Sequence, residues 1–306
     1  MDQIKVFGHI APDTDTVCSA IVYAWYLTNI KGVLAKAYRL GELNKETEYV
    51  LKWAGVDVPE FLEKLEKDDR VAIVDTNNAE ELIDLSGVEI DSIVDHHKLA
   101  GNISTAAPVE VTIRPVACTA SIIYSLADAL SEEMPEEILK LILAAIISDT
   151  LMFRSPTTTD FDKEIAEVIA SELGIDIKEL SEKMFAAKSD LSGMSAKDLV
   201  LVDSKVIDLE DKKYRISVLE TTKPNNALEM KDDIKVAMKE IAAEEGLDDV
   251  FFFVIDILNE DATLIVSTDS AKAKAENSFG VAIEDDKVIL PGVVSRKKQI
   301  IPALSK

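Results

Sequence analysis

Imidazole and carboxylate groups gather in a few short segments of this chain. All three histidines lie in such segments: one begins the run His9-Ile10-Ala11-Pro12-Asp13-Thr14-Asp15, and two lie in Asp95-His96-His97. Another acid, Asp75, follows the apolar run Val71-Ala72-Ile73-Val74. A single histidine beside an aspartate is usually structural, because imidazole readily occupies polar turns. The recurrence of the pattern instead favours a shared chemical role.

Divalent metal binding is the chemistry that this pattern favours. Imidazole nitrogen together with carboxylate oxygen suits Mn²⁺, Co²⁺, Fe²⁺ or Zn²⁺, whereas oxygen alone suits Mg²⁺. Asp13 and Asp15 flank Thr14, so their side chains can reach two different ions. A carboxylate such as Asp75 can bridge two ions about 3.5 to 4 Å apart, and such a pair holds the attacking and leaving oxygens during phosphoryl transfer.

Asp149 is a further candidate ligand at the end of a strongly apolar predicted helix. A carboxylate is costly to bury, and the C-terminal end of a helix dipole disfavours its charge, so a nearby cation would relieve both effects. Exposure in a turn is the alternative for Asp149. Asp13 or Asp15 can likewise serve only to cap a helix that begins near Thr16, and one of them can do both.

A basic cluster, Arg296-Lys297-Lys298, stands out in a chain whose formal net charge is −24. Such a run is ordinarily a solvated face. Here Pro291-Gly292 precedes it and Gln299 follows it, which predicts a loop that opens onto a short terminal helix. Guanidinium and ammonium groups in such a loop can hold phosphate oxygens, and the amides of a helix N-terminus add to that attraction.

Alternating strand and helix patterns are expected to position these groups. Short β-branched runs that end in acidic or histidine-bearing turns predict strands at residues 4–7, 71–74 and 90–94. Amphipathic patterns predict helices at residues 16–27, 44–54, 119–130, 136–147 and 161–173. This order predicts an α/β domain with a mostly parallel sheet flanked by helices, in which ligands bind beyond the C-terminal ends of the strands.

A second, smaller domain is expected after a predicted helix at residues 176–187. The small, polar segment 189–195 is typical of a hinge linker, so we place a catalytic domain at residues 1–188 and a C-terminal domain at residues 196–306. Patterns in the latter predict a mixed-sheet α/β domain with strands at 202–209, 214–219, 250–257 and 263–267 and a helix at 226–245.

Composition excludes several classes of protein. The chain has 306 residues, of which 47% are hydrophobic and 29% charged, and no apolar run reaches the ~18 residues of a membrane-spanning helix. The N-terminus enters a strand pattern without a secretory signal, which predicts a cytoplasmic protein. The charge of −24 disfavours a nucleic-acid partner, because binding to a polyanion depends on lysine and arginine. Cys18 and Cys118 lie among apolar residues and are expected to be buried thiols.

As a set, these motifs resemble the family II inorganic pyrophosphatases, which belong to the DHH phosphoesterase superfamily. The resemblance extends over essentially the whole chain. Four of its motifs are common to the superfamily: residues 9–15, Asp75-Thr76-Asn77, Asp95-His96-His97 and Ser148-Asp149-Thr150. The fifth, Ser295-Arg296-Lys297-Lys298-Gln299, is the signature of the family itself. The resemblance implies a DHH domain followed by a DHHA2-like domain.

The resemblance also implies a role for each matching residue. It implies one metal site with the ligands His9, Asp13 and Asp75, and a second with the ligands Asp15, Asp75, His96 and Asp149. It implies catalytic roles for Asp13, Asp95 and His97, with His97 also contacting the substrate and Asp95 orienting its neighbours. The implied substrate-binding residues of the second domain are Lys205, Arg296 and Lys297, of which Lys205 is the least distinctive match.

The activity implied is hydrolysis of pyrophosphate to two orthophosphates by a hydroxide that bridges two metal ions. The family uses Mn²⁺ or Co²⁺ at these two sites and brings Mg²⁺ in with the substrate. Closure of the C-terminal domain is expected to bring its cationic groups to the phosphates. The family also forms homodimers through the N-terminal domain.

Two alternatives remain open at this point. An exopolyphosphatase or a small nucleotide or oligonucleotide phosphatase of the same superfamily would share the metal ligands. Such relatives carry a Gly-Gly-His type motif in the second domain, whereas no histidine follows His97 here. The other alternative is a non-catalytic metal or nucleotide sensor. Regulated members carry inserted CBS domains, for which this chain has no room between Asp75 and Ser295.

Overall fold

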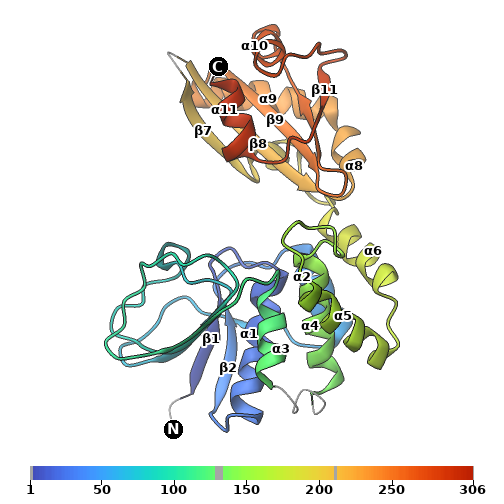
Figure 1. The fold of residues 1–306 in the computed structure, drawn as a ribbon. Coiled ribbons are helices and arrows are strands. Elements are labelled where there is room, and N and C mark those ends of the chain that lie inside the picture. The colour runs from blue at the N-terminus through green and yellow to red at the C-terminus, as the bar shows by residue number, and fades with distance from the viewer. Residues whose placement is uncertain (1–2, 128–133, 210–211, 306) are drawn as a thin grey trace. The chain divides into compact units, whose positions relative to one another are not determined.

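Contacts within the chain divide it into two units, residues 1–187 and residues 188–306. Each unit has a sheet of its own. The computed structural model describes residues 3–127, 134–209 and 212–305 (Figure 1). The α/β class predicted for the chain is confirmed, with a parallel sheet in the first unit and a mixed sheet in the second.

The N-terminal unit is built on a six-stranded parallel sheet with the strand order β3-β2-β1-β4-β5-β6. Its strands are β1 Ile4–Phe7, β2 Ala35–Arg39, β3 Glu60–Phe61, β4 Arg70–Val74, β5 Glu89–Asp95 and β6 Glu110–Ile113. β1, β4 and β5 correspond to the three predicted strands. The other three have no counterpart among the predictions, because they are short and only partly buried or exposed.

The direction in which strands are added reverses at β1. The chain places β2 and β3 on one side of β1 and then β4, β5 and β6 on the other. In open parallel sheets such a reversal separates the loops that leave two neighbouring strands, and ligands bind in the crevice between them. The C-terminal ends of β1 and β4 therefore mark the expected site.

Helices of the N-terminal unit match the predicted ones within a few residues. They are α1 Thr14–Asn29, α2 Lys45–Ala54, α3 Thr119–Ala127, α4 Glu136–Asp149, α5 Asp160–Leu173 and α6 Ile177–Lys188. Residues 128–130, which end one predicted helix, lie outside the described residues. α1 and α3 pack on the sheet, and α4 packs against α1, α2 and α5 (Figure 1). Every residue from Leu141 to Ile147 in α4 is fully buried, as expected of a helix that is apolar on all sides.

The C-terminal unit has a mixed sheet with the strand order β11-β10-β9-β8-β7. Its strands are β7 Ser204–Leu209, β8 Lys212–Thr221, β9 Asp249–Asp256, β10 Asp261–Ile265 and β11 Lys287–Pro291. Its helices are α7 Ala196–Leu201, α8 Pro224–Leu228, α9 Lys231–Glu245, α10 Asp269–Phe279 and α11 Ile301–Leu304. Among the described strands of this unit, only β8 and β9 pair in parallel, and α8 and α9 connect them.

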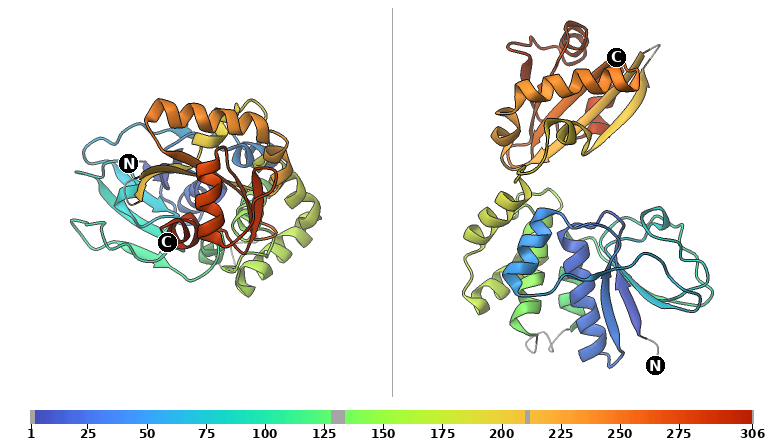
Figure 2. Two further views of the ribbon diagram at one scale, coloured as in Figure 1. Left: turned by 90° about the horizontal axis from the view of Figure 1, so that it is seen from above. Right: turned by 180° about the vertical axis from the view of Figure 1, so that it is seen from behind.

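Both faces of this second sheet are covered. α9 lies on one face of the sheet, and α10 and α11 lie on the other (Figure 2). Phe251 and Phe253 of β9 belong to the core on the side of α10 and α11, whereas Phe252 belongs to the core on the side of α9. Alternate residues of β9 thus enter different cores, and its consecutive apolar residues are explained by burial on both sides.

Three features of the C-terminal unit differ from the predicted ones by more than a small shift of an element's ends. The single helix predicted at residues 226–245 is two helices, because α8 ends at Leu228 and α9 begins at Lys231. Val202 follows α7 as its C-cap and does not begin a strand. The basic run at residues 296–298 is a helical turn and not an open loop, since residues Arg296–Ile300 form a π-helical turn that leads into α11.

The segment predicted as a hinge is attached to the C-terminal unit. The Ser189 hydroxyl lies 2.7 Å from the Thr222 hydroxyl, and Asn226 donates a side-chain hydrogen bond to the Ser189 carbonyl. Leu191 and Met194 pack against the α9 side of the sheet. The hinge at 189–195 stays a prediction.

All the helices that the structure describes are too short or too polar to span a lipid bilayer.

Gly8 occupies a position with no room for a side chain. A Cβ atom there would lie 2.6 Å from Thr16 Cγ2 and 2.7 Å from the Val74 carbonyl oxygen. We expect Gly8→Ala to lower the free energy of unfolding by about 1–3 kcal/mol, the usual cost of overpacking a closed site. Thermal unfolding of the purified variant measures this loss.

Gly32→Ala measures the cost of backbone strain without overpacking, for comparison with Gly8→Ala. A Cβ atom at Gly32 meets no atom within 4 Å, so only its φ of +69° opposes alanine. That backbone strain costs about 1–2 kcal/mol. A Gly8 variant as stable as the wild type would show that the strand end can widen.

Candidate metal centre

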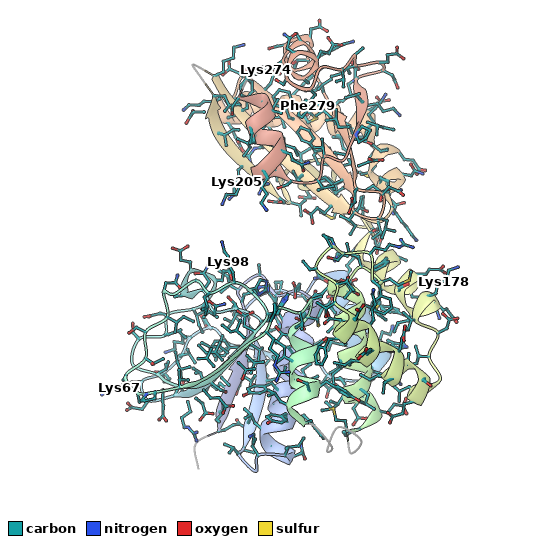
Figure 3. All side chains as sticks on the ribbon, viewed as in Figure 1. Lys67, Lys98, Lys178, Lys205, Lys274 and Phe279 are labelled. Atoms are coloured by element: carbon teal, nitrogen blue, oxygen red, sulfur yellow. The ribbon has the colours of Figure 1, made fainter. Side chains whose placement is uncertain are left out.

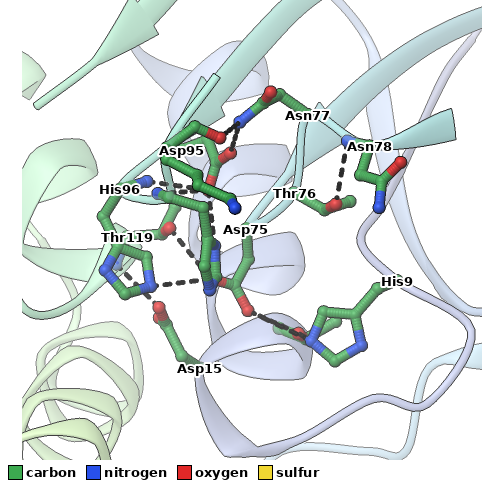
Figure 4. A network of polar contacts seen from close by, with 12 residues as sticks. His9, Asp15, Asp75, Thr76, Asn77, Asn78, Asp95, His96 and Thr119 are labelled. Carbon is green, nitrogen blue, oxygen red and sulfur yellow. Dashed lines mark hydrogen bonds and ion pairs between the residues drawn. The ribbon is translucent and has the colours of Figure 1, made fainter. Parts of the chain in front are cut away.

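The sequence motifs converge at the C-terminal ends of three neighbouring strands. The segment that carries His9 and Asp13 follows β1, Asp75 follows β4, and Asp95 is the last residue of β5. Figure 4 shows that His9, Asp15, Asp75 and His96 point toward one another. The site therefore lies where the strand order reverses, as the sheet topology leads one to expect.

Three groups of side chains have potential ligand atoms within 4.8 Å of one another in the described part of the chain. The groups are His9, Asp13 and Asp75; Asp15, His96 and Asp149; and Asp75, His96 and His97. All six residues predicted as metal ligands are thus brought together. The donor set of imidazole nitrogen and carboxylate oxygen fits a transition metal such as manganese.

Asp75 belongs to two of these groups, as does His96. Its Oδ2 lies 3.6 Å from His9 Nε2, and its Oδ1 lies 3.4 Å from His96 Nε2. The two oxygens of one buried carboxylate therefore face different histidines, which is the arrangement that a bridging ligand requires. Asp75 also has a φ of +59°, a left-handed conformation that aspartate tolerates better than most residues and that is concentrated at functional sites.

Asp13 both caps α1 and faces His9. Its Oδ1 accepts a hydrogen bond of 2.9 Å from the Thr16 amide, and its Oδ2 lies 3.9 Å from His9 Nε2. Asp13, and not Asp15, is therefore the helix cap. Asp15 lies inside the first turn of α1, where both its oxygens accept hydrogen bonds from the start of α3, the Thr119 amide at 2.7 Å among them.

The charge balance of the site favours a cation. Burial and the nearby charge of Asp75 raise the pKa of Asp15 to about 7. Burial and the charges of Asp15 and Asp13 raise the pKa of Asp149 well above its ordinary value. Burial would also raise the pKa of Asp75, but hydrogen bonds with His9 and His96 hold it below its ordinary value. Divalent cations would offset this repulsion among carboxylates.

His96 and His97 are oriented differently by their neighbours. His96 Nδ1 lies 3.1 Å from the Val116 carbonyl oxygen, so Nδ1 carries a proton and Nε2 faces Asp75. A histidine that ligates a metal typically has such a partner on its second nitrogen. His97 has 54% of its side chain exposed, and its Nδ1 lies 2.9 Å from Asp95 Oδ1.

Asp95 is fully buried and holds the loop that follows β5. Its Oδ1 accepts hydrogen bonds from the amides of His96 and His97, and its Oδ2 accepts one from the Asn77 side chain (Figure 4). Burial would raise the pKa of Asp95, but the hydrogen bonds from His97 and Asn77 lower it, so Asp95 stays ionised. Asp95 thus holds the backbone of both histidines and the His97 ring, and its catalytic role stays a prediction.

Several polar contacts of the site were not predicted. The Thr16 hydroxyl lies 2.6 Å from His9 Nε2 and donates to Asp75 Oδ2 at 2.5 Å, and the Thr119 hydroxyl donates to Asp75 Oδ1 at 3.1 Å. Asn77 belongs to a quoted motif, but nothing in its type indicated a bond to Asp95. The position of Thr16 gave one signal that it lies near the site. It is the third residue after the helix cap Asp13, and such a residue donates its amide to the cap.

The predicted substrate-binding residues lie in the C-terminal unit. Lys205, Arg296 and Lys297 line one cavity of about 450 Å³, together with Asp203 and Glu220. Lys205 is exposed and extends outward from β7 (Figure 3). Arg296 Nη1 donates to Asp203 Oδ1 at 2.7 Å. The three cations are therefore brought together, with Arg296 already held by a carboxylate.

The remaining residues of the terminal motif explain the shape of this turn. Ser295 Oγ accepts from the Lys298 amide at 3.2 Å and caps the π-helical turn. Gln299 Oε1 accepts from the amides of Val294 and Ser295 at 2.9 Å each. Serine and glutamine thus fold the turn that presents Arg296 and Lys297.

Both units match known protein families. Residues 3–146 match the N-terminal domain of the DHH family, and residues 182–306 match the DHHA2 domain. The fold and the site thus define a protein of the DHH class with a DHHA2 domain.

Relatives over the full length identify the family. The chain is 38% identical to a probable manganese-dependent inorganic pyrophosphatase of Lactobacillus gasseri, with 100% of this chain and 98% of the relative covered. It is 36% identical to the manganese-dependent inorganic pyrophosphatase of Bacillus subtilis, with the same coverage. The structure of a putative family II inorganic pyrophosphatase of Methanococcus jannaschii matches with a TM-score of 0.69 and 34% identity, over 99% of this chain and 98% of that one. The chain belongs to the manganese-dependent, family II inorganic pyrophosphatases.

Metal affinity should rise with pH at this site. Asp15 has a pKa of about 7. Burial lowers the pKa of His96, but its contact with Asp75 outweighs this effect and raises the pKa to about 9. Both groups hold protons at lower pH, and a metal ion must displace them. We expect Mn²⁺ to bind more tightly as pH rises from about 6 to 8, by about tenfold per pH unit for each proton displaced.

Calorimetric titration of the metal-free protein with Mn²⁺ tests this expectation. Repeating the titration in buffers with different protonation enthalpies counts the protons released. A constant affinity over this range, with no proton release, would contradict the expected competition.

Proposed function

We propose that this chain hydrolyses inorganic pyrophosphate to two orthophosphates at a pair of divalent metal ions. The observation that carries the proposal is the convergence of the predicted ligands around Asp75, whose two oxygens face His9 and His96. Full-length similarity to proteins named manganese-dependent inorganic pyrophosphatase supports the choice of substrate and metal.

The six ligands divide between two metal positions. We assign His9, Asp13 and Asp75 to the first, in agreement with their mutual proximity. Asp15, His96 and Asp149 form the second together with Asp75 as the bridge. Mn²⁺ or Co²⁺ suits these mixed ligands, and Mg²⁺ is proposed to accompany the substrate.

The bound cations would neutralise phosphate charge and lower the pKa of the attacking water. His97 is proposed to contact the substrate and to protonate the leaving phosphate. Its hydrogen bond to Asp95 raises its pKa, which favours the protonated ring that this role requires. The buried Asp95 keeps that ring oriented through the 2.9 Å contact with Nδ1.

The cavity lined by Lys205, Arg296 and Lys297 is proposed to hold phosphate oxygens. A guanidinium group can bind two such oxygens in parallel, and lysine adds positive charge. Asp203 would share Arg296 with the substrate, because its carboxylate already accepts from Nη1.

The proposal also includes a hinge within residues 189–195, a homodimer formed through the N-terminal unit and a cytoplasmic location.

Phosphate release decides between the candidate functions. We expect the purified chain to release phosphate from pyrophosphate after incubation with Mn²⁺, and to lose this activity when a chelator removes the metal. Tripolyphosphate and a short oligonucleotide serve as competing substrates. Preference for tripolyphosphate would favour an exopolyphosphatase, preference for the oligonucleotide a nuclease-like phosphatase, and Mn²⁺ binding without any phosphate release a sensor.

Arg296→Ala should separate substrate binding from metal binding. We expect kcat/KM for pyrophosphate to fall about 10- to 100-fold, as expected for the loss of ~1.5–3 kcal/mol in hydrogen bonds to a charged group. The Mn²⁺ dissociation constant should stay nearly unchanged, because Arg296 belongs to none of the ligand groups found among the described residues.

Lys298→Ala is the matched control. Lys298 is exposed in the same basic run but does not line the cavity, so its removal should leave kcat/KM near the wild-type value. Loss of Mn²⁺ affinity in Arg296→Ala would refute the separate role of this cavity.

A further inference from the structure

Glu46 is a buried carboxylate next to the metal centre without being one of its ligands. Its side chain is in the first turn of α2, and only 1% of the residue is exposed. It belongs to none of the potential ligand groups found among the described residues. Glutamate is rarely so buried unless its oxygens receive hydrogen bonds.

The hydrogen bonds of Glu46 connect two helices that carry proposed ligands. Its Oε2 accepts from the Thr14 hydroxyl of α1 at 3.1 Å and from the Ser148 hydroxyl of α4 at 2.9 Å. Thr14 lies between Asp13 and Asp15, and Ser148 directly precedes Asp149. One carboxylate oxygen therefore joins the start of α1 to the end of α4, and α2 packs against both helices (Figure 1).

Residues next to Glu46 also contact the loop that follows β1, which carries Asp13. The Thr47 hydroxyl lies 3.1 Å from the Thr14 hydroxyl, and Asn44 caps α2 by accepting from the Thr47 amide at 2.8 Å. A Cβ atom on Gly41 would lie only 2.3 Å from the Ile10 carbonyl oxygen, so the two backbones approach as closely as glycine allows. Residues 41–47 are thus packed closely against the loop that follows β1.

We propose that Glu46 is a positioning residue for the metal centre. By holding Thr14 and Ser148 at one oxygen, it fixes the separation between Asp15 of α1 and Asp149 of α4. Ligands from different helices must keep a fixed separation to bind both metal ions. Hydrogen bonds to neighbouring residues that are not themselves ligands maintain that separation. This inference rests on the proposed function, because it takes these aspartates to be metal ligands.

Mn²⁺ affinity of the metal-free protein tests the inference without relying on activity. We expect Glu46→Ala to raise the Mn²⁺ dissociation constant about 10- to 100-fold, the usual effect of losing an outer contact to metal ligands. Glu46→Gln keeps an oxygen that can accept both hydroxyl groups, so its loss of affinity should be smaller. Calorimetric titration well below the melting temperature measures all these values.

Glu48 supplies the matched control. It lies in the same helix as Glu46 but is exposed, so Glu48→Ala and Glu48→Gln should bind Mn²⁺ like the wild type. A folded Glu46→Ala protein with a lower melting temperature and unchanged Mn²⁺ affinity would overturn the inference, since Glu46 would then serve stability alone.

If Glu46→Ala does not fold, the Mn²⁺ affinities of Glu46→Gln and Ser148→Ala decide. Affinity equal to that of the Glu48 variants would overturn the inference, and weaker binding would support it.

A double-mutant cycle tests the connection to α4. Because Ser148 is proposed to act through Glu46, Ser148→Ala should weaken Mn²⁺ binding much less in the Glu46→Ala background than in the wild type. Fully additive effects would contradict a shared hydrogen bond. A wild type that binds Mn²⁺ but releases no phosphate would refute the proposed function, while the effect of Glu46 on Mn²⁺ affinity would still stand.

Discussion

Like-charge repulsion among buried carboxylates is the constraint on which the N-terminal unit depends. Asp15 and Asp75 are almost wholly buried, and Asp149 faces Asp15 from another helix. Hydroxyl groups, amides and imidazoles satisfy many of the oxygens, but they do not remove the effects of burial and of the Asp75 charge, which raise the pKa of Asp15. Cations of high charge would offset that repulsion, and mixed nitrogen and oxygen donors favour transition metals among them.

Rigid, strongly buried elements hold that arrangement against its own repulsion. α4 is apolar on all sides through its last turns, so its end can move little. The strands β1, β4 and β5 are adjacent in one parallel sheet, which fixes the spacing of the loops that leave them. The basic residues of the C-terminal unit are positioned in another way. They are mostly exposed, and a local turn that Ser295 and Gln299 stabilise sets the position of Arg296 and Lys297.

Much of this architecture could be predicted from the sequence because the relevant signals are local. β-branched runs indicated β1, β4 and β5, and the parallel topology made their trailing residues meet. β3 and β6 lie at the edges of the sheet, where pairing with a neighbour decides the structure more than composition does. The break between α8 and α9 also had no local signal, because the cap of α9 is Met230 without a side-chain hydrogen bond. Histidine and aspartate types indicated the ligands, whereas Thr16, Asn77 and Glu46 contact partners distant in sequence and belong to common residue types.

The two contacts of Asp13 have a consequence for how the protein tolerates change. One oxygen completes the first turn of α1 and the other faces His9, so a single side chain contributes to secondary structure and to a group of potential metal ligands. A replacement that removes both oxygens therefore forfeits a cap worth ~1 kcal/mol in addition to any metal contact. Asparagine retains one oxygen for the amide while it discards the negative charge. One substitution at this position would therefore disturb the start of α1 and the contact with His9 together.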